Sequence, residues 1–219
     1  MSPYKEMSWL STKIKDKVFN LHENEEFRFY CENANSIGAL FSYMGSIVLN
    51  RQEWNISGFD PDPQVRAYAL ASSLISLTKR KCRLKYLKKS LVFWSNDNES
   101  FQNSGGLVKR YLLDFDGYLR LADKYCANDQ NLKKAFLKVM TREHPWYCVI
   151  HVTSLINDLN SWIEFKNKLI AFGYSSVMIG FCRFWAKHQV LVEAAVKLKR
   201  KIVRSGIYLW LNKGKTDAG

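Results

Sequence analysis

The chain has 219 residues, which fits one large domain or two small ones. Hydrophobic residues make up 47% of it and aromatic residues 14%, so a sizeable core can form and wholesale disorder is excluded. Lysine and arginine number 33 against 20 aspartates and glutamates, a formal net charge of +13. An excess of this size attracts polyanions, of which nucleic acid is the commonest and an anionic membrane surface the next.

Cysteine usage and the lack of targeting signals predict a cytoplasmic protein. The five cysteines are odd in number, widely spaced and without a C-x-x-C pair, which is typical of reduced thiols. The N-terminus has no apolar signal segment. The most apolar stretch, 169–185, is interrupted by glycines, serines and Arg183, so we expect no transmembrane helix. Few aromatic residues flank the basic helices, which argues against a membrane partner.

The N-terminal part is predicted to carry a small β element. Residues 13–19 alternate partly with period two, and the aromatic run 27–30 is typical of a strand. Apolar residues at helical spacing then predict a helix over 34–50. A turn-rich link precedes a long helix expected from Pro63 to about Lys89, with Asp62 as its N-cap.

The rest of the chain is predicted to be helical. A short strand at 91–94 and a loop up to 106 lead into helices over 107–125, 130–141, 146–171 and 175–204. Gly173 suits a helix C-terminus. No repeat or long linker divides the chain, so we expect one mainly α domain over 1–219 with a small N-terminal β element. Within it, residues 10–50 would form a strand-plus-helix DNA-binding part.

Three acid-poor clusters concentrate the positive charge, at residues 13–17, 79–89 and 197–204. Flexible cations of this kind suit the phosphate backbone of a nucleic acid, although a solvated helix face is the plain structural alternative. The residues predicted to bind nucleic acid are Lys13, Lys15, Lys17, Arg28, Lys79, Arg80, Lys81, Arg83, Lys85, Lys88, Lys89, Lys197, Lys199, Arg200, Lys201 and Arg204.

Residues 114–117, Asp-Phe-Asp-Gly, resemble the first motif of haloacid-dehalogenase-type phosphotransferases, in which the first aspartate attacks phosphorus. Tyr118 replaces the usual threonine, and Phe181 stands where a downstream acid would be needed for magnesium. We therefore expect an amphipathic helix whose acids face solvent or pair with Arg110 and Arg120. No cofactor is predicted.

Arg183 and His188 form an R-x4-H pattern that resembles the motif of HEPN ribonucleases, where arginine steadies phosphate and histidine assists attack by the ribose hydroxyl. Phe184 occupies a position that is usually polar in that motif. A ribonuclease using these two residues is the enzymatic alternative. The structural alternative is an interfacial arginine and a packed histidine.

His144, Cys148 and His151 stand at i, i+4 and i+7, and their side chains are of types that bind zinc. However, Pro145 places His144 before the helix, and no fourth ligand lies nearby in the sequence. Ordinary packing is therefore preferred, and metal binding by these three residues is left open.

Several stretches, taken in order, resemble the AcaB-like regulators of conjugative plasmids and integrative conjugative elements. They are residues 18–22, the helix start at 60–70 and the acidic, leucine-rich segment 112–121. The resemblance implies a homodimeric, non-enzymatic transcriptional regulator that binds double-stranded DNA in ribbon-helix-helix fashion, with paired N-terminal strands in the major groove. Lys13, Lys15, Lys17 and Arg28 would then lie on the ribbon. A non-catalytic RNA-binding or assembly protein is a further alternative.

Overall fold

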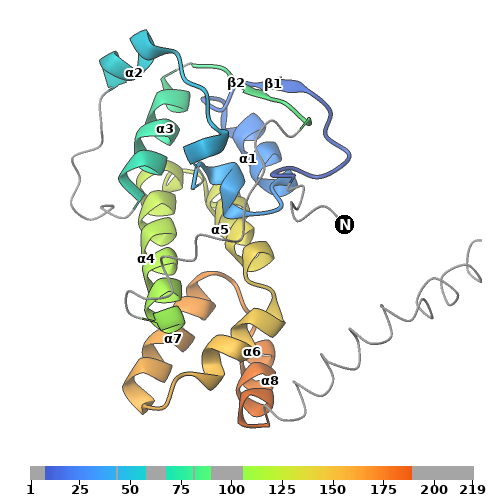
Figure 1. The fold of residues 1–219 in the computed structure, drawn as a ribbon, viewed down its shortest axis with the longest axis vertical. Coiled ribbons are helices and arrows are strands. Elements are labelled where there is room, and N and C mark those ends of the chain that lie inside the picture. The colour runs from blue at the N-terminus through green and yellow to red at the C-terminus, as the bar shows by residue number, and fades with distance from the viewer. Residues whose placement is uncertain (1–7, 43, 58–67, 81, 90–105, 189–219) are drawn as a thin grey trace, which may run out of the picture.

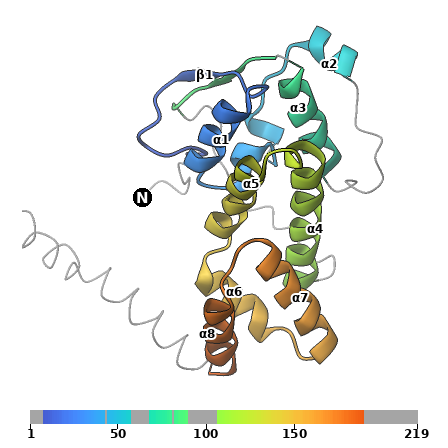
Figure 2. The same cartoon turned by 180° about the vertical axis from the view of Figure 1, so that it is seen from behind.

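The computed structural model describes residues 8–42, 44–57, 68–80, 82–89 and 106–188. They form an elongated, mainly helical body with one small sheet near its N-terminal end (Figures 1 and 2). The predicted fold class, mainly α with a small N-terminal β element, is confirmed. Among the described helices, none is long and apolar enough to span a bilayer.

The sheet has two antiparallel strands, β1 (Lys17–Phe19) and β2 (Leu84–Tyr86), with Val18 opposite Lys85. The strand expected to form a ribbon with a second copy therefore pairs with a strand of its own chain, and no ribbon-helix-helix part is seen in the described residues. The long helix predicted to reach Lys89 is wrong beyond Lys79, where α3 (Ala69–Lys79) ends. Its predicted start at 62–67 and the strand at 91–94 lie outside the described residues.

The aromatic run 27–30 is helical, not extended, because it lies inside α1 (Asn24–Asn33). Phe27, Tyr30 and Cys31 stand at i, i+3 and i+4 and are buried on one face of this helix. The helix predicted over 34–50 is also wrong. Two short 3-10 turns, η1 (Ile37–Leu40) and η2 (Met44–Ser46), take its place, and the left-handed backbone of Phe41 (φ 64°) ends the first. Then α2 (Arg51–Ser57) occupies part of the expected link.

Two helices begin and end close to their predicted bounds, α4 (Gly106–Cys126) and α5 (Gln130–Glu143). The Asp129 side chain caps α5 by accepting from the backbone N–H groups of Asn131 and Leu132, at 3.0 and 2.9 Å. This cap gives the second helix a defined start only a few residues after the first one ends.

The helix predicted over 146–171 is in fact two, α6 (Trp146–Ser154) and α7 (Leu159–Ala171). Asp158 accepts from the backbone N–H of Ser161 at 2.7 Å, so it starts a new helix where the sequence pattern alone suggested continuity. Gly173, with φ +86°, follows the end of α7 as expected. After it comes α8 (Ser176–Lys187), and the predicted continuation to 204 lies outside the described residues.

Helix α4 forms the centre of the hydrophobic core and joins the two ends of the body (Figure 1). On one side the Phe115 ring packs against Phe165 of α7 and Phe172, with centroids 5.9 and 4.9 Å apart. One turn on, Tyr118 packs against Phe136 of α5 at 6.2 Å. Each fully buried aromatic ring of this kind stabilises a fold by about 1.5–3 kcal/mol.

Two helical glycines of different surroundings provide a test of this packing. A Cβ on buried Gly117 would lie 2.1 Å from the Tyr68 ring, whereas one on exposed Gly180 would meet nothing within 4 Å. We expect Gly117→Ala to lower the free energy of unfolding by about 1–3 kcal/mol because of overpacking. Gly180→Ala should raise it by about 0.5–1 kcal/mol, since alanine is the better helix former. Urea unfolding measures both, and an equal shift for the two variants would contradict the described packing.

Candidate functional site

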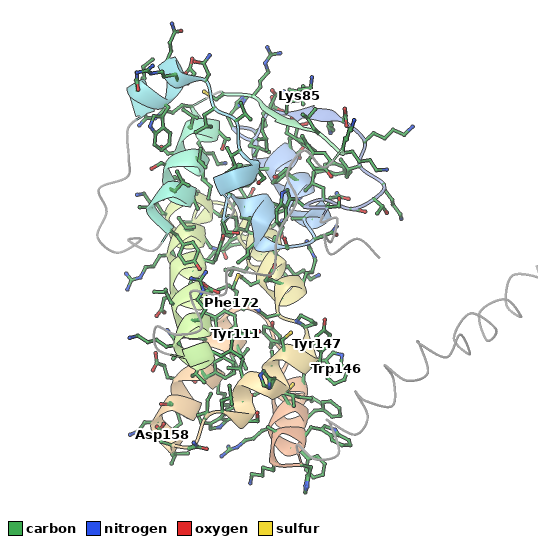
Figure 3. All side chains as sticks on the ribbon, in the orientation of Figure 1. Lys85, Tyr111, Trp146, Tyr147, Asp158 and Phe172 are labelled. Carbon is green, nitrogen blue, oxygen red and sulfur yellow. The ribbon has the colours of Figure 1, made fainter. Side chains whose placement is uncertain are left out.

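Many of the basic residues predicted to bind nucleic acid lie at the sheet end of the body. Lys13 and Lys15 are exposed ahead of β1. Lys85 is on the paired strand β2, and Lys88 and Lys89 follow it; all three are exposed (Figure 3 labels Lys85). Strand pairing thus joins the first two clusters into one basic surface.

Several members of those clusters are engaged within the chain. The Lys88 ammonium donates to the Thr12 carbonyl at 3.1 Å. The Lys17 ammonium lies 3.4 Å from the Glu26 carboxylate and covers the Phe29 ring. Lys79 donates to the Asn24 amide oxygen at 2.9 Å. Arg28 makes a weak ion pair with Glu32 on the same helix, and Arg80 and Arg83 are exposed. Lys81, Lys197, Lys199, Arg200, Lys201 and Arg204 lie outside the described residues.

Arg183 and His188 do not form a shared site. The Arg183 guanidinium stacks on the Trp162 ring of α7, with 4.7 Å to the ring centroid. His188 follows the last turn of α8 and packs against Phe184 at 4.9 Å. Five residues of helix separate the two side chains by about 140° around the axis. The arrangement matches the structural alternative, a packed arginine and histidine, better than a ribonuclease centre.

His144, Cys148 and His151 also lie in different surroundings. His144 is buried at the C-terminus of α5, Cys148 is half-buried beside Tyr111, and His151 is exposed on α6. Within the described ranges, no three histidine, cysteine or carboxylate side chains are placed to hold a metal ion together.

Asp114 and Asp116, the two carboxylates of the phosphatase-like segment, point to different sides of α4. Asp114 is paired with Arg110, as the amphipathic-helix interpretation expects. Asp116 forms an ion pair with Lys168 of α7. Residues two apart in a helix are about 200° apart around its axis, so these acids do not converge on one ligand.

Asp114 belongs to a buried polar cluster between α4 and the residue preceding α3. It is 4% exposed; the Tyr68 hydroxyl donates to one carboxylate oxygen, and the Arg110 Nε lies 3.0 and 3.3 Å from the two oxygens. Burial raises the pKa of Asp114, and the Tyr68 hydrogen bond and the Arg110 charge oppose that rise. Because both oxygens are already held, Asp114 acts on the fold and not on a substrate.

His144 lies against the same part of α4. Its ring stacks on Tyr111 at 4.1 Å, and its buried Nε2 has no hydrogen-bond partner in the described residues. Burial, with a smaller effect of the Arg110 charge, lowers the pKa of His144 to about 4. The Tyr174 hydroxyl donates to the His144 carbonyl at 2.5 Å, which ties the turn before α8 to the end of α5.

A hollow of about 240 Å³ lies on the outer side of that turn. Its walls are largely apolar, with Leu137, Phe172 and Met178, and two exposed lysines of α5, Lys134 and Lys138, lie at it. Small-molecule sites usually measure about 300–1,000 Å³, so this hollow fits one ring or one anionic group and not a large ligand. No local sequence pattern indicates it, because its lining comes from α5 and from the α7–α8 turn.

Comparison with known proteins finds no matching family model and no matching solved structure. Over 140 residues, however, the chain is 34% identical to the abequosyltransferase RfbV of Salmonella typhimurium (strain LT2). The matched region is 64% of this chain and 41% of that protein, so the chain spans about two fifths of the length of the curated relative it matches.

This similarity corrects the functional interpretation of the sequence. The relative is a sugar transferase and therefore an enzyme, not an AcaB-like regulator. The predictions of a DNA-binding transcriptional regulator of conjugative elements, of double-stranded DNA as the partner and of no enzymatic role are wrong, as are the ribonuclease and RNA-binding alternatives. Net charge had indicated an anionic partner, but it carries no information on the chemistry of that partner.

Burial of the His144 imidazole predicts that the folded protein becomes less stable as the pH falls. The pKa of His144 falls from 6.5 in the unfolded chain to about 4 in the folded one. Above pH 6.5 this histidine is neutral in both states and does not lower the free energy of unfolding. As the pH falls from 6.5 towards 4, only the unfolded chain takes up the proton, so the free energy of unfolding falls by about 3 kcal/mol. His144→Phe keeps the ring on Tyr111 and removes the titration. We expect this variant to lose less stability than the wild type between pH 7 and pH 4, measured by urea unfolding. His151→Phe, at an exposed position, is the control and should follow the wild type; equal slopes for all three proteins would contradict the burial of His144.

Proposed function

We propose that this chain takes part in glycosyl transfer and that its helical body binds a sugar substrate of that reaction. The observation that carries the proposal is the 34% identity over 140 residues to an abequosyltransferase. By that relative's name, a sugar, abequose, is the group it transfers. For the present chain we propose glycosyl transfer as the class of reaction, and experiment is to identify the sugar that is transferred. The odd number of widely spaced cysteines supports a cytoplasmic setting.

Glycosyl transfer forms a bond between an acceptor hydroxyl oxygen and the anomeric carbon of an activated sugar. The bond from that carbon to its leaving group breaks, the leaving group departs with the electron pair, and the hydroxyl proton passes to a base. When the leaving group is a phosphate or diphosphate, the substrate presents negative charge beside a sugar ring. A site for part of such a substrate therefore needs an apolar wall and a cation.

The hollow between α5 and the α7–α8 turn offers both features. Lys134 and Lys138 stand one helical turn apart, so their ammonium groups lie on the same face of α5. Phe172 and Met178 supply apolar surface beside them. Its inner wall is fixed from behind, since Phe172 packs on Phe115 and the Tyr174 hydroxyl is bonded to His144. These contacts support a preformed subsite for the anionic or sugar part of a donor.

The full chain should bind nucleotide-activated sugars saturably in isothermal titration, and with an oligosaccharide acceptor it should yield a new glycoside detected by mass spectrometry. Lys134→Ala with Lys138→Ala should weaken donor binding by about two- to thirtyfold, since each exposed charge pair contributes about 0.2–1 kcal/mol. Lys13→Ala with Lys15→Ala removes the same charge at the other end and is the control.

Two results would count against the proposal. Failure of the full chain to bind any activated sugar of the panel would overturn the assignment to glycosyl transfer. Equal weakening by the two double variants would show that net charge, not the hollow, attracts the donor.

A further inference from the structure

Five aromatic side chains of α6 and α8 form a continuous surface that no described residue covers, which we call the aromatic surface: Trp146, Tyr147, Phe181, Phe184 and Trp185. All but the partly buried Trp185 are 47–58% exposed. Each ring contacts the next in the order Tyr147, Trp146, Phe181, Trp185 and Phe184, with centroids 5.8–6.0 Å apart. Figure 3 shows Trp146 and Tyr147 at the outer edge of α6, on the side of α8.

Exposed aliphatic side chains extend the apolar character of this end of the molecule. Val177 on α8 is 84% exposed, and Leu159 and Ile163 are exposed one turn apart on α7. These three helices together make up the end of the body opposite the sheet (Figure 1). Large apolar side chains gathered at one end of a protein mark an interaction surface, because leaving them in water is unfavourable.

On the two helices that carry the aromatic surface the charges are of one sign, whereas exposed acids, Asp158 and Glu164, lie just before and on α7. Helices α6 and α8 contain no aspartate or glutamate. Lys187 is exposed on α8 one turn from Phe184, whereas Arg183 stacks on Trp162 of α7, and the chain as a whole carries +13. The expectation that basic helices lack exposed aromatic neighbours therefore fails at α8. Aromatic rings beside lysine and arginine are the composition of segments that lie in the interface of an anionic bilayer.

We propose that the aromatic surface docks the protein onto an anionic phospholipid membrane, with the rings among the headgroups and Lys187 against lipid phosphates. The helices would lie on the membrane and not cross it. A second copy of the chain fits this surface less well, because like charges on α8 would face each other. A sugar chain also fits less well, since the surface lacks the carboxylates that accept hydrogen bonds from hydroxyl groups. The inference does not depend on glycosyl transfer.

Vesicle co-sedimentation of the full chain tests this proposal. The protein should bind vesicles of phosphatidylcholine with phosphatidylglycerol more tightly than vesicles of phosphatidylcholine alone, and added salt should weaken the difference. Brominated phosphatidylglycerol should quench its tryptophan fluorescence, because Trp146 and Trp185 would reach the acyl boundary. Lys187→Glu should reduce the preference for the anionic vesicles.

Phe181→Ser with Phe184→Ser should weaken vesicle binding at least tenfold, since two half-exposed rings would lose their apolar contact. The matched control is Val48→Ser with Ile56→Ser, which changes two side chains 95% and 74% exposed near the other end. This control should bind as the wild type does, and circular dichroism checks that both variants fold.

Several outcomes would overturn the proposal. They are no binding of the wild type to anionic vesicles, equal binding by the two double variants, or a dimer in solution that only the phenylalanine variant dissociates while vesicles are not bound. Saturable binding of a soluble oligosaccharide that is lost in the phenylalanine variant, without vesicle binding, would assign the surface to sugar instead. None of these results bears on whether the hollow at Lys134 and Lys138 binds a sugar donor.

Discussion

The rest of the fold depends on the hydrogen bonds made by one buried carboxylate on α4. Asp114 is held by the Tyr68 hydroxyl and the Arg110 guanidinium, and nearby Gly117 leaves room for the Tyr68 ring to lie against the helix. Removing one partner of the Asp114 carboxylate costs about 1–3 kcal/mol, because it leaves a buried acceptor without its hydrogen bond. The residue preceding α3 is thus fixed to the centre of α4.

From that centre the two ends of the body are built in different ways. Towards the sheet, polar contacts reinforce the buried rings: the Arg142 guanidinium donates to the carbonyls of Cys31 and Ala34, and Glu143 accepts from the backbone N–H of Ile37 at 3.1 Å. Towards α6–α8, rings dominate, with Phe115 against Phe165 and Phe172. The ring contacts continue out to the surface at α8, so the same kind of packing that makes the core is left exposed there.

Sequence patterns predicted the elements whose information is local. Helix α5 has a regular apolar face and a side-chain cap at Asp129, and both signals lie within the helix or next to it. Strand β2 depends instead on pairing with a strand more than sixty residues earlier, and its Leu84 continued a helical spacing of leucines. The sequence patterns predicted neither the hollow nor the aromatic surface, for the same reason. Each is formed by residues of different helices, and a pattern within one segment does not show which helices pack together.

The site was harder to predict than the fold because charge alone does not specify a ligand. DNA, an activated sugar and a lipid headgroup all present phosphate, so a net charge of +13 attracts each of them. Neighbouring side chains separate them. Lys17 and Lys79 already have partners on α1, whereas Lys134 stands beside an apolar hollow and Lys187 beside exposed rings. A cation next to an apolar hollow favours a small anion with a ring, and one next to exposed aromatic rings favours a bilayer.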